Sequence, residues 1–91
     1  MTQFEWDPAK AATNYAKHGV AFADAIGVFE DDQALTIEDT STDEERFKTL
    51  GTDFLGRLLV VVYAYRSDRI RLISARKATG PQRDVYDRNQ R

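Results

Sequence analysis

Cysteine is absent from this 91-residue chain, and histidine occurs only once, as His18. Without thiols the protein has no disulfide, no thiolate nucleophile and no cysteine-based zinc site. A single imidazole also disfavours a transition-metal site. We therefore expect a protein that uses no cofactor and no resident metal.

Long apolar runs are missing as well. The longest, Leu58 to Tyr65, is far shorter than the ~18 residues that a membrane-spanning helix requires. No basic region followed by an apolar stretch is present near the N-terminus, so we expect no signal peptide. With 42% hydrophobic and 31% charged residues, the composition predicts one small domain, residues 1–91, in the cytoplasm and away from membranes.

Charge is unevenly distributed, although the net charge is only −2. Residues 1–45 hold eleven acidic and two basic residues, whereas residues 46–91 hold four acidic and eleven basic ones. Such asymmetry is typical of a protein whose basic half binds a polyanion or an acidic partner. Two halves that neutralise each other within the fold would show the same asymmetry, so both interpretations stay open.

Local patterns at the N-terminus predict a short strand and a helix. Residues 3–6 alternate polar and apolar side chains, as strands do. Asp7 and Pro8 are typical of a helix start, and Gly19 is typical of a helix end. Lys17 and His18 would then lie where the helix dipole favours positive charge. The packed face of this helix is expected to consist of small residues, namely Ala9, Ala12 and Ala16.

A second helix is predicted from residue 22 to residue 29, with Phe22, Ile26 and Phe29 toward the core. The hydrophobic period then changes to two, which predicts strands at 34–38, 46–51, 57–65 and 69–75. The third of these is apolar on both faces, as a central strand would be. Thr79 and Gln82 form a capping-box pattern before a last helix. This order predicts an α+β fold with an antiparallel β meander.

Two expected strands carry cations on one face only. Arg46 and Lys48 share a face in one strand, and Arg69 and Arg71 share a face in another. Further cations follow, namely Arg76, Lys77 and Arg83. Because arginine grips phosphate through parallel hydrogen bonds, this pattern indicates a polyanion-binding face. A solvated sheet face with outward arginines is the structural alternative.

Metal-free RNA cleavage is compatible with these side chains. The acid pairs Asp31-Asp32 and Glu44-Glu45 are suited to magnesium, but adjacent loop acids are more often solvated surface. No phosphate-binding glycine loop is present. In RNA the 2′-hydroxyl is a built-in nucleophile, so a protein need only supply a base, an acid and charge stabilisation.

The segment FEWDPAKAATNYAKHGVAFADA, residues 4–25, resembles the opening of the BrnT toxins. The segments EERFKTLG, GRLLVVVYAYR and DRIRLISARKAT resemble the rest of that family in the same order. This resemblance implies a RelE-like fold and a ribonuclease toxin of a type II toxin–antitoxin system that inhibits translation. The implied partners are RNA, either free mRNA or mRNA on the ribosome, and a BrnA-like ribbon-helix-helix antitoxin. DNA would be contacted only indirectly, through that antitoxin.

The chain departs from the family pattern at two positions. Ala21 stands where a serine usually caps the second helix, which costs about 1 kcal/mol of capping energy. Gln82 stands where the family tends to have an acid in the last helix. Glutamine cannot act as a base, but it serves equally well in a capping box, which is the role we favour.

The candidate catalytic set comprises Arg46, Arg76, Lys77, His18 and Tyr86. The first three would stabilise charge on the phosphate, His18 would serve acid–base chemistry, and Tyr86 would stack on a base or donate a proton. The candidate RNA-binding set comprises Lys17, Lys48, Arg69, Arg71 and Arg83. Structural alternatives are a surface ion pair for the three cations, with Glu44 or Glu45 as the partner of Arg46. For His18 the alternative is a helix end, and for Tyr86 it is a core position. A non-catalytic nucleic-acid- or protein-binding module is the competing interpretation of the whole chain.

Overall fold

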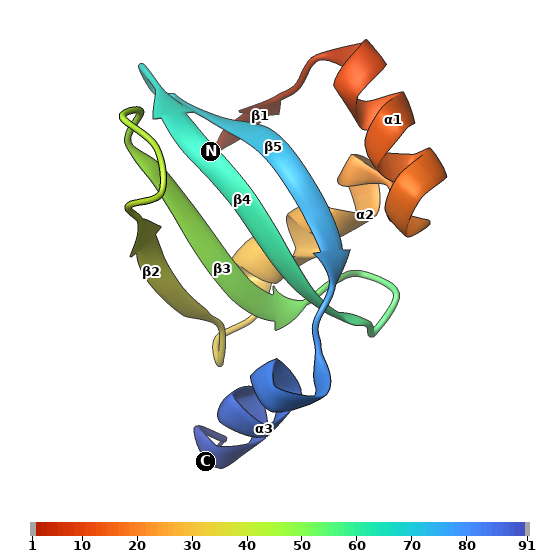
Figure 1. Cartoon of the computed structure of the whole chain (residues 1–91), viewed down its shortest axis with the longest axis vertical. Helices are drawn as coiled ribbons and strands as arrows, with labels where there is room; N and C mark the ends of the chain where they lie inside the picture. The colour runs from red at the N-terminus through yellow and green to blue at the C-terminus, as the bar shows by residue number, and fades with distance from the viewer. Residues whose placement is uncertain (1, 91) are drawn as a thin grey trace.

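The computed structural model describes residues 2–90 and confirms the α+β class. Its five strands are arranged in the order β1-β5-β4-β3-β2. The last four strands form the predicted antiparallel meander, and β1 pairs in parallel with β5 at the edge (Figure 1). The strands are β1 (Gln3–Glu5), β2 (Leu35–Asp39), β3 (Arg46–Thr52), β4 (Leu58–Arg66) and β5 (Arg69–Lys77). Their bounds lie within two residues of the predicted ones.

Three helical segments cover one face of the sheet, namely α1 (Pro8–His18), α2 (Phe22–Ala25) and the 3-10 helix η1 (Ile26–Glu30). The last helix, α3 (Gly80–Arg88), lies at one end of the molecule, beyond the ends of the strands (Figure 1). The core between sheet and helices includes Val20, Phe22, Ala25, Val28, Leu59, Val61, Tyr63 and Leu72. Phe4 and Trp6 pack against this core. The central strand β4 is buried over most of its length, as predicted.

The start and end of α1 agree with the sequence, but its packed face does not. The Asp7 carboxylate accepts a hydrogen bond from the Ala9 backbone N–H at 2.9 Å, and Gly19 closes the helix with φ 69°. The predicted alanine face was wrong, because Ala9, Ala12 and Ala16 are all exposed. The helix instead turns Ala11 and Asn14 toward the sheet.

Asn14 determines this orientation through three hydrogen bonds. Its Nδ2 donates to the carbonyl of Ala75 at 2.8 Å and to that of Val20 at 3.2 Å, and its Oδ1 accepts from the Ala75 N–H at 3.1 Å. Strand β1 pairs with β5 only at residues 69–71, so the backbone of Ala75 has no strand partner on that side. The Asn14 amide takes the place of the missing strand and fixes α1 on β5.

The second helix is interrupted earlier than predicted. The α-helical part ends at Ala25, and the segment from Ile26 continues as a tighter 3-10 turn. Gly27 lies against the loop between β3 and β4, where a Cβ would overlap the backbone nitrogen of Phe54. This close approach, together with the hydrogen bond from Phe54 N–H to the Asp24 carbonyl at 3.3 Å, tightens the chain there. The absence of a capping side chain at Ala21 is confirmed.

A β-bulge in β5 changes which side chains face which way. Val62 pairs with Ser74 and Tyr63 pairs with Leu72, so Ile73 is an extra residue without a partner on β4. The bulge shifts the alternation by one residue, as bulges do.

Within residues 2–90, no helix is long and apolar enough to cross a membrane.

Replacing Asn14 should test the attachment of α1. We expect Asn14→Ala to lower the free energy of unfolding by about 3 kcal/mol, because it leaves buried backbone groups of Ala75 without a partner. Urea unfolding measures this change. Thr13→Ala, at an exposed neighbouring position, is the control and should change stability by less than about 0.5 kcal/mol. Equal stability of the two variants would contradict this role of Asn14.

Candidate functional site

Five of the predicted site residues share the sheet face opposite α1 and α2, which we call the open face. They are Arg46, Lys48, Arg69, Arg71 and Arg76. Strand pairing places Arg76 beside Val60, Lys48 beside Val62, and Arg71 beside Ala64. The cations therefore succeed one another along the sheet, from the end next to α3 to the turn between β4 and β5.

Arg76 lies at the end of the open face next to α3. Its Nη1 donates to Gln82 Oε1 at 3.2 Å and to the Lys77 carbonyl at 3.2 Å. Gln82 Oε1 also accepts from the Thr79 N–H at 2.9 Å, and Thr79 Oγ1 accepts from the Gln82 N–H. The predicted capping box is thus confirmed. The same glutamine that caps α3 orients the Arg76 guanidinium.

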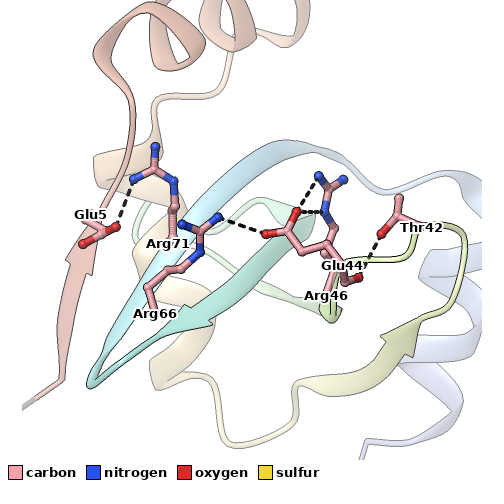
Figure 2. A network of polar contacts seen from close by, with 6 residues as sticks. All are labelled: Glu5, Thr42, Glu44, Arg46, Arg66 and Arg71. Atoms are coloured by element: carbon pink, nitrogen blue, oxygen red, sulfur yellow. Dashed lines mark hydrogen bonds and ion pairs between the residues drawn. The ribbon is translucent and has the colours of Figure 1, made fainter.

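The opposite end of the open face holds a network of ion pairs (Figure 2). Glu44 bridges Arg46 and Arg66, and Glu5 pairs with Arg71 at 2.9 Å. Hydrogen bonds from Arg66 and then Arg46 hold the pKa of Glu44 below its ordinary value. The sequence did not single out Arg66 or Glu5, but the alternative that Glu44 or Glu45 holds Arg46 is confirmed for Glu44. Strand alternation could have predicted Arg66, because it is two residues after Ala64 and therefore lies on the open face with it.

The structure places the remaining candidates elsewhere. Lys77 pairs with Leu59, a core residue, so its side chain lies on the face opposite to Arg76. Lys17 and His18 end α1 and line a shallow cavity of about 330 Å³ at the free edge of β5, which Ser74 also lines. Arg83 is exposed on α3. These residues are not brought together with the cations of the open face.

Tyr86 anchors α3 to the body of the protein. Its hydroxyl donates to Asp31 Oδ2 at 2.6 Å and lies 3.3 Å from Thr52 Oγ1. Burial, followed by the hydrogen bond to Asp31, raises the pKa of Tyr86. Burial also works to raise the pKa of Asp31, but hydrogen bonds from Tyr86, Thr52 and Gln33 outweigh it and lower that pKa overall. No residue of α3 is buried, so this contact is a principal attachment of the helix.

Carboxylates near the open face are already engaged by protein donors. Asp31 accepts from Tyr86, from the Thr52 N–H at 2.8 Å and from the Gln33 N–H at 2.9 Å, and Glu44 accepts from two arginines. In the described range 2–90, no three histidine, cysteine, aspartate or glutamate residues are grouped so as to hold a metal ion.

A sheet with a basic open face and helices on the other side defines a candidate RNA-binding protein. The family model described as ribonuclease toxin, BrnT, of type II toxin-antitoxin system matches residues 6–81. The chain therefore belongs to the BrnT family of ribonuclease toxins, as its motifs indicated. Membership in this family implies an RNA substrate and an antitoxin partner.

A solved structure supports the fold. The chain is similar to the 1.1 Å crystal structure of the Brucella abortus ribonuclease toxin BrnT, with a TM-score of 0.66 and 23% sequence identity. The similarity covers 87% of this chain and 99% of the Brucella chain. Among curated proteins, no significant sequence match was found. At this identity the structural match establishes the common fold alone.

Replacing Tyr86 should reveal the Asp31 contact through its pH dependence. We expect Tyr86→Phe to destabilise the protein by about 1 kcal/mol at pH 7, because the ionised carboxylate loses a donor. Since the folded-state pKa of Asp31 is lowered, this contribution is present above its unfolded pKa of about 3.9 and lost as the pH falls through the folded value. Denaturant unfolding of both proteins across pH measures the difference. Tyr15→Phe, at an exposed tyrosine, should show no such pH dependence.

His18 is expected to tolerate replacement. It lies at the edge of β5, beside the open face and not on it, so we expect His18→Ala to retain RNA cleavage within about tenfold of the wild type. The measurement is the rate of transcript cleavage together with growth arrest on induced expression. Complete loss of cleavage in a folded His18→Ala protein would make this histidine catalytic.

Proposed function

We propose that the chain is a metal-independent endoribonuclease of the RelE-like group that cleaves mRNA in the cytoplasm and so inhibits translation. A BrnA-like ribbon-helix-helix antitoxin neutralises it. The observation that carries the proposal is the succession of Arg76, Lys48 and Arg46 along the sheet face opposite α1 and α2. A row of cations held along a sheet suits the repeated negative charges of a phosphodiester backbone.

The reaction that suits this face is transfer within the RNA itself. The 2′-oxygen attacks the adjacent phosphorus and loses its proton to a base, the bond from phosphorus to the 5′-oxygen breaks, and that oxygen takes up a proton. The product ends are a 2′,3′-cyclic phosphate and a 5′-hydroxyl. Arg76, held by Gln82, would stabilise the charge that builds up on the phosphate oxygens.

Metal independence is supported by the engagement of Asp31, the carboxylate at the α3 end of the open face. Its oxygens accept hydrogen bonds from Tyr86, Thr52 and Gln33, so it offers no unengaged oxygen ligand. The catalytic assignments of Lys77, His18 and Tyr86 stay predictions. For Tyr86, the hydrogen bond to Asp31 favours an anchoring role.

A non-catalytic RNA- or protein-binding module is the second candidate. The observation that favours it is the engagement of Tyr86, because this leaves the open face, as described for residues 2–90, without an unengaged histidine, tyrosine or carboxylate to act as a general base. The two candidates differ in whether bound RNA is cut.

Arg76→Ala should separate these candidates. With purified protein and transcripts, both with and without ribosomes, we expect cleavage to fall by about 10²–10³-fold while thermal unfolding stays unchanged, since one preorganised charge donor is lost. Arg88→Ala, which removes an exposed arginine from α3, is the control and should cleave normally. EDTA should leave the wild-type rate unchanged.

Three results would contradict the proposal or its assignment of the active centre. Wild-type protein that binds RNA but never cuts it, even with ribosomes, would favour the binding module. Loss of cleavage in EDTA would remove the metal-independent mechanism. Cleavage that persists in a folded Arg46→Ala/Arg76→Ala double variant would show that the active centre lies elsewhere on the protein.

A further inference from the structure

One carboxylate holds two arginines from different strands at the end of the open face far from α3. Glu44 Oε2 accepts from Arg46 Nε at 3.2 Å and from Arg46 Nη2 at 3.0 Å, and Glu44 Oε1 accepts from Arg66 Nη2 at 3.1 Å. Figure 2 shows Glu44 between the two guanidinium groups. A phosphodiester also presents two anionic oxygens, and guanidinium groups bind both kinds of anion in the same forked geometry.

The neighbouring strand adds further positive charge. Arg71 pairs with Ala64, and Arg46 precedes Phe47, the partner of Tyr63, so Arg46 and Arg71 flank Ala64 on the open face. Glu5 binds Arg71 at 2.9 Å and Arg69 at 3.6 Å. Four arginines from three strands thus gather at this end of the sheet, and their nearest carboxylates are Glu5, Glu44 and Asp39, which is in register with Arg46.

The two carboxylates differ in how firmly the backbone holds them. Glu5 lies within β1, in register with Arg71 on β5, so its position is fixed by the sheet. Glu44 lies in the exposed loop 40–45 between β2 and β3, outside any strand. The Glu44 side chain is 39% exposed and that of Glu5 is 27% exposed, and solvent-exposed ion pairs are weak. A competing anion can therefore exchange with Glu44 more readily than with Glu5.

We propose that Arg46 and Arg66 form a second phosphate-binding subsite for the RNA backbone, which Glu44 occupies in the free protein and an RNA phosphate takes over. This subsite rests on the proposed RNA substrate. Val60, the partner of Arg76, and Arg66 are six residues apart on β4, which corresponds to about 20 Å. The subsite therefore binds a phosphate several nucleotides away from one held at Arg76.

Glu44→Gln tests the exchange, and Glu45→Gln is its matched control. Both variants remove one negative charge from the same loop, but Glu45 makes no ion pair with any residue of the described range 2–90. The probe is a fluorescent single-stranded 2′-O-methyl RNA oligonucleotide, which binds but cannot be cut because its nucleophile is blocked. Fluorescence anisotropy at several salt concentrations gives the dissociation constant of each variant, and thermal unfolding verifies its fold.

Glu44→Gln should bind the oligonucleotide about three- to tenfold more tightly at low salt, and Arg66→Ala should bind it less tightly by a similar factor. A plot of log affinity against log salt should become steeper by about 0.7 in the first variant and shallower by about 0.7 in the second, as expected for one phosphate contact on a single strand. Glu45→Gln should stay within about twofold of the wild type. The gain from Glu44→Gln should disappear in the Glu44→Gln/Arg66→Ala double variant.

The subsite is wrong if Glu44→Gln behaves like Glu45→Gln, if Arg66→Ala binds like the wild type, or if no variant binds the oligonucleotide at low salt. Cleavage of the unmodified RNA is measured separately. If the variants change binding as expected but the wild type does not cleave RNA, the subsite is supported and the nuclease proposal is refuted. If the wild type cleaves RNA but the variants do not change binding as expected, the nuclease proposal is supported and the subsite is refuted.

Discussion

The candidate site depends on the pleat of β3, β4 and β5, because only one face of these strands is covered by α1, α2 and η1. Burial of alternate residues such as Thr49, Val61 and Leu72 sends every intervening side chain to the open face, whatever its charge. The bulge at Ile73 then resets the alternation. If residues 71–77 alternated regularly, without a bulge, Lys77 would share a face with Arg71; with the bulge, Arg76 does.

Local signals in the sequence predicted most of the fold. Helix ends are marked by contacts between near neighbours, at Asp7, Gly19 and the Thr79–Gln82 pair. The strands are predicted by the alternation of polar and apolar residues. The features that escaped prediction are all long-range. The parallel pairing of β1, the Asn14 bonds to Ala75 and the tightening at Gly27 each depend on groups distant in the chain, which no local pattern encodes.

The same distinction applies to the site. Alternation correctly placed Arg46 with Lys48 and Arg69 with Arg71, because those pairs lie within single strands. It did not predict that Lys77 and Arg76 lie as they do relative to Arg71, because nothing in this sequence predicts the bulge in β5. Nor did it show that Tyr86 is bound by Asp31, 55 residues earlier in the chain, because such a hydrogen bond exists only once α3 has docked.

The charge asymmetry of the sequence allowed two interpretations, neutralisation within the fold or attraction of a polyanion, and the structure makes them compatible. The acidic half supplies Glu5 and Glu44, and the basic half supplies their arginine partners. An unpaired basic face would attract any polyanion through long-range electrostatics. Internal carboxylates reduce that general attraction while keeping the guanidinium groups extended over the sheet. In the subsite proposed above, a phosphate would replace the carboxylate that belongs to an exposed loop, Glu44, and not the one that lies within a strand, Glu5.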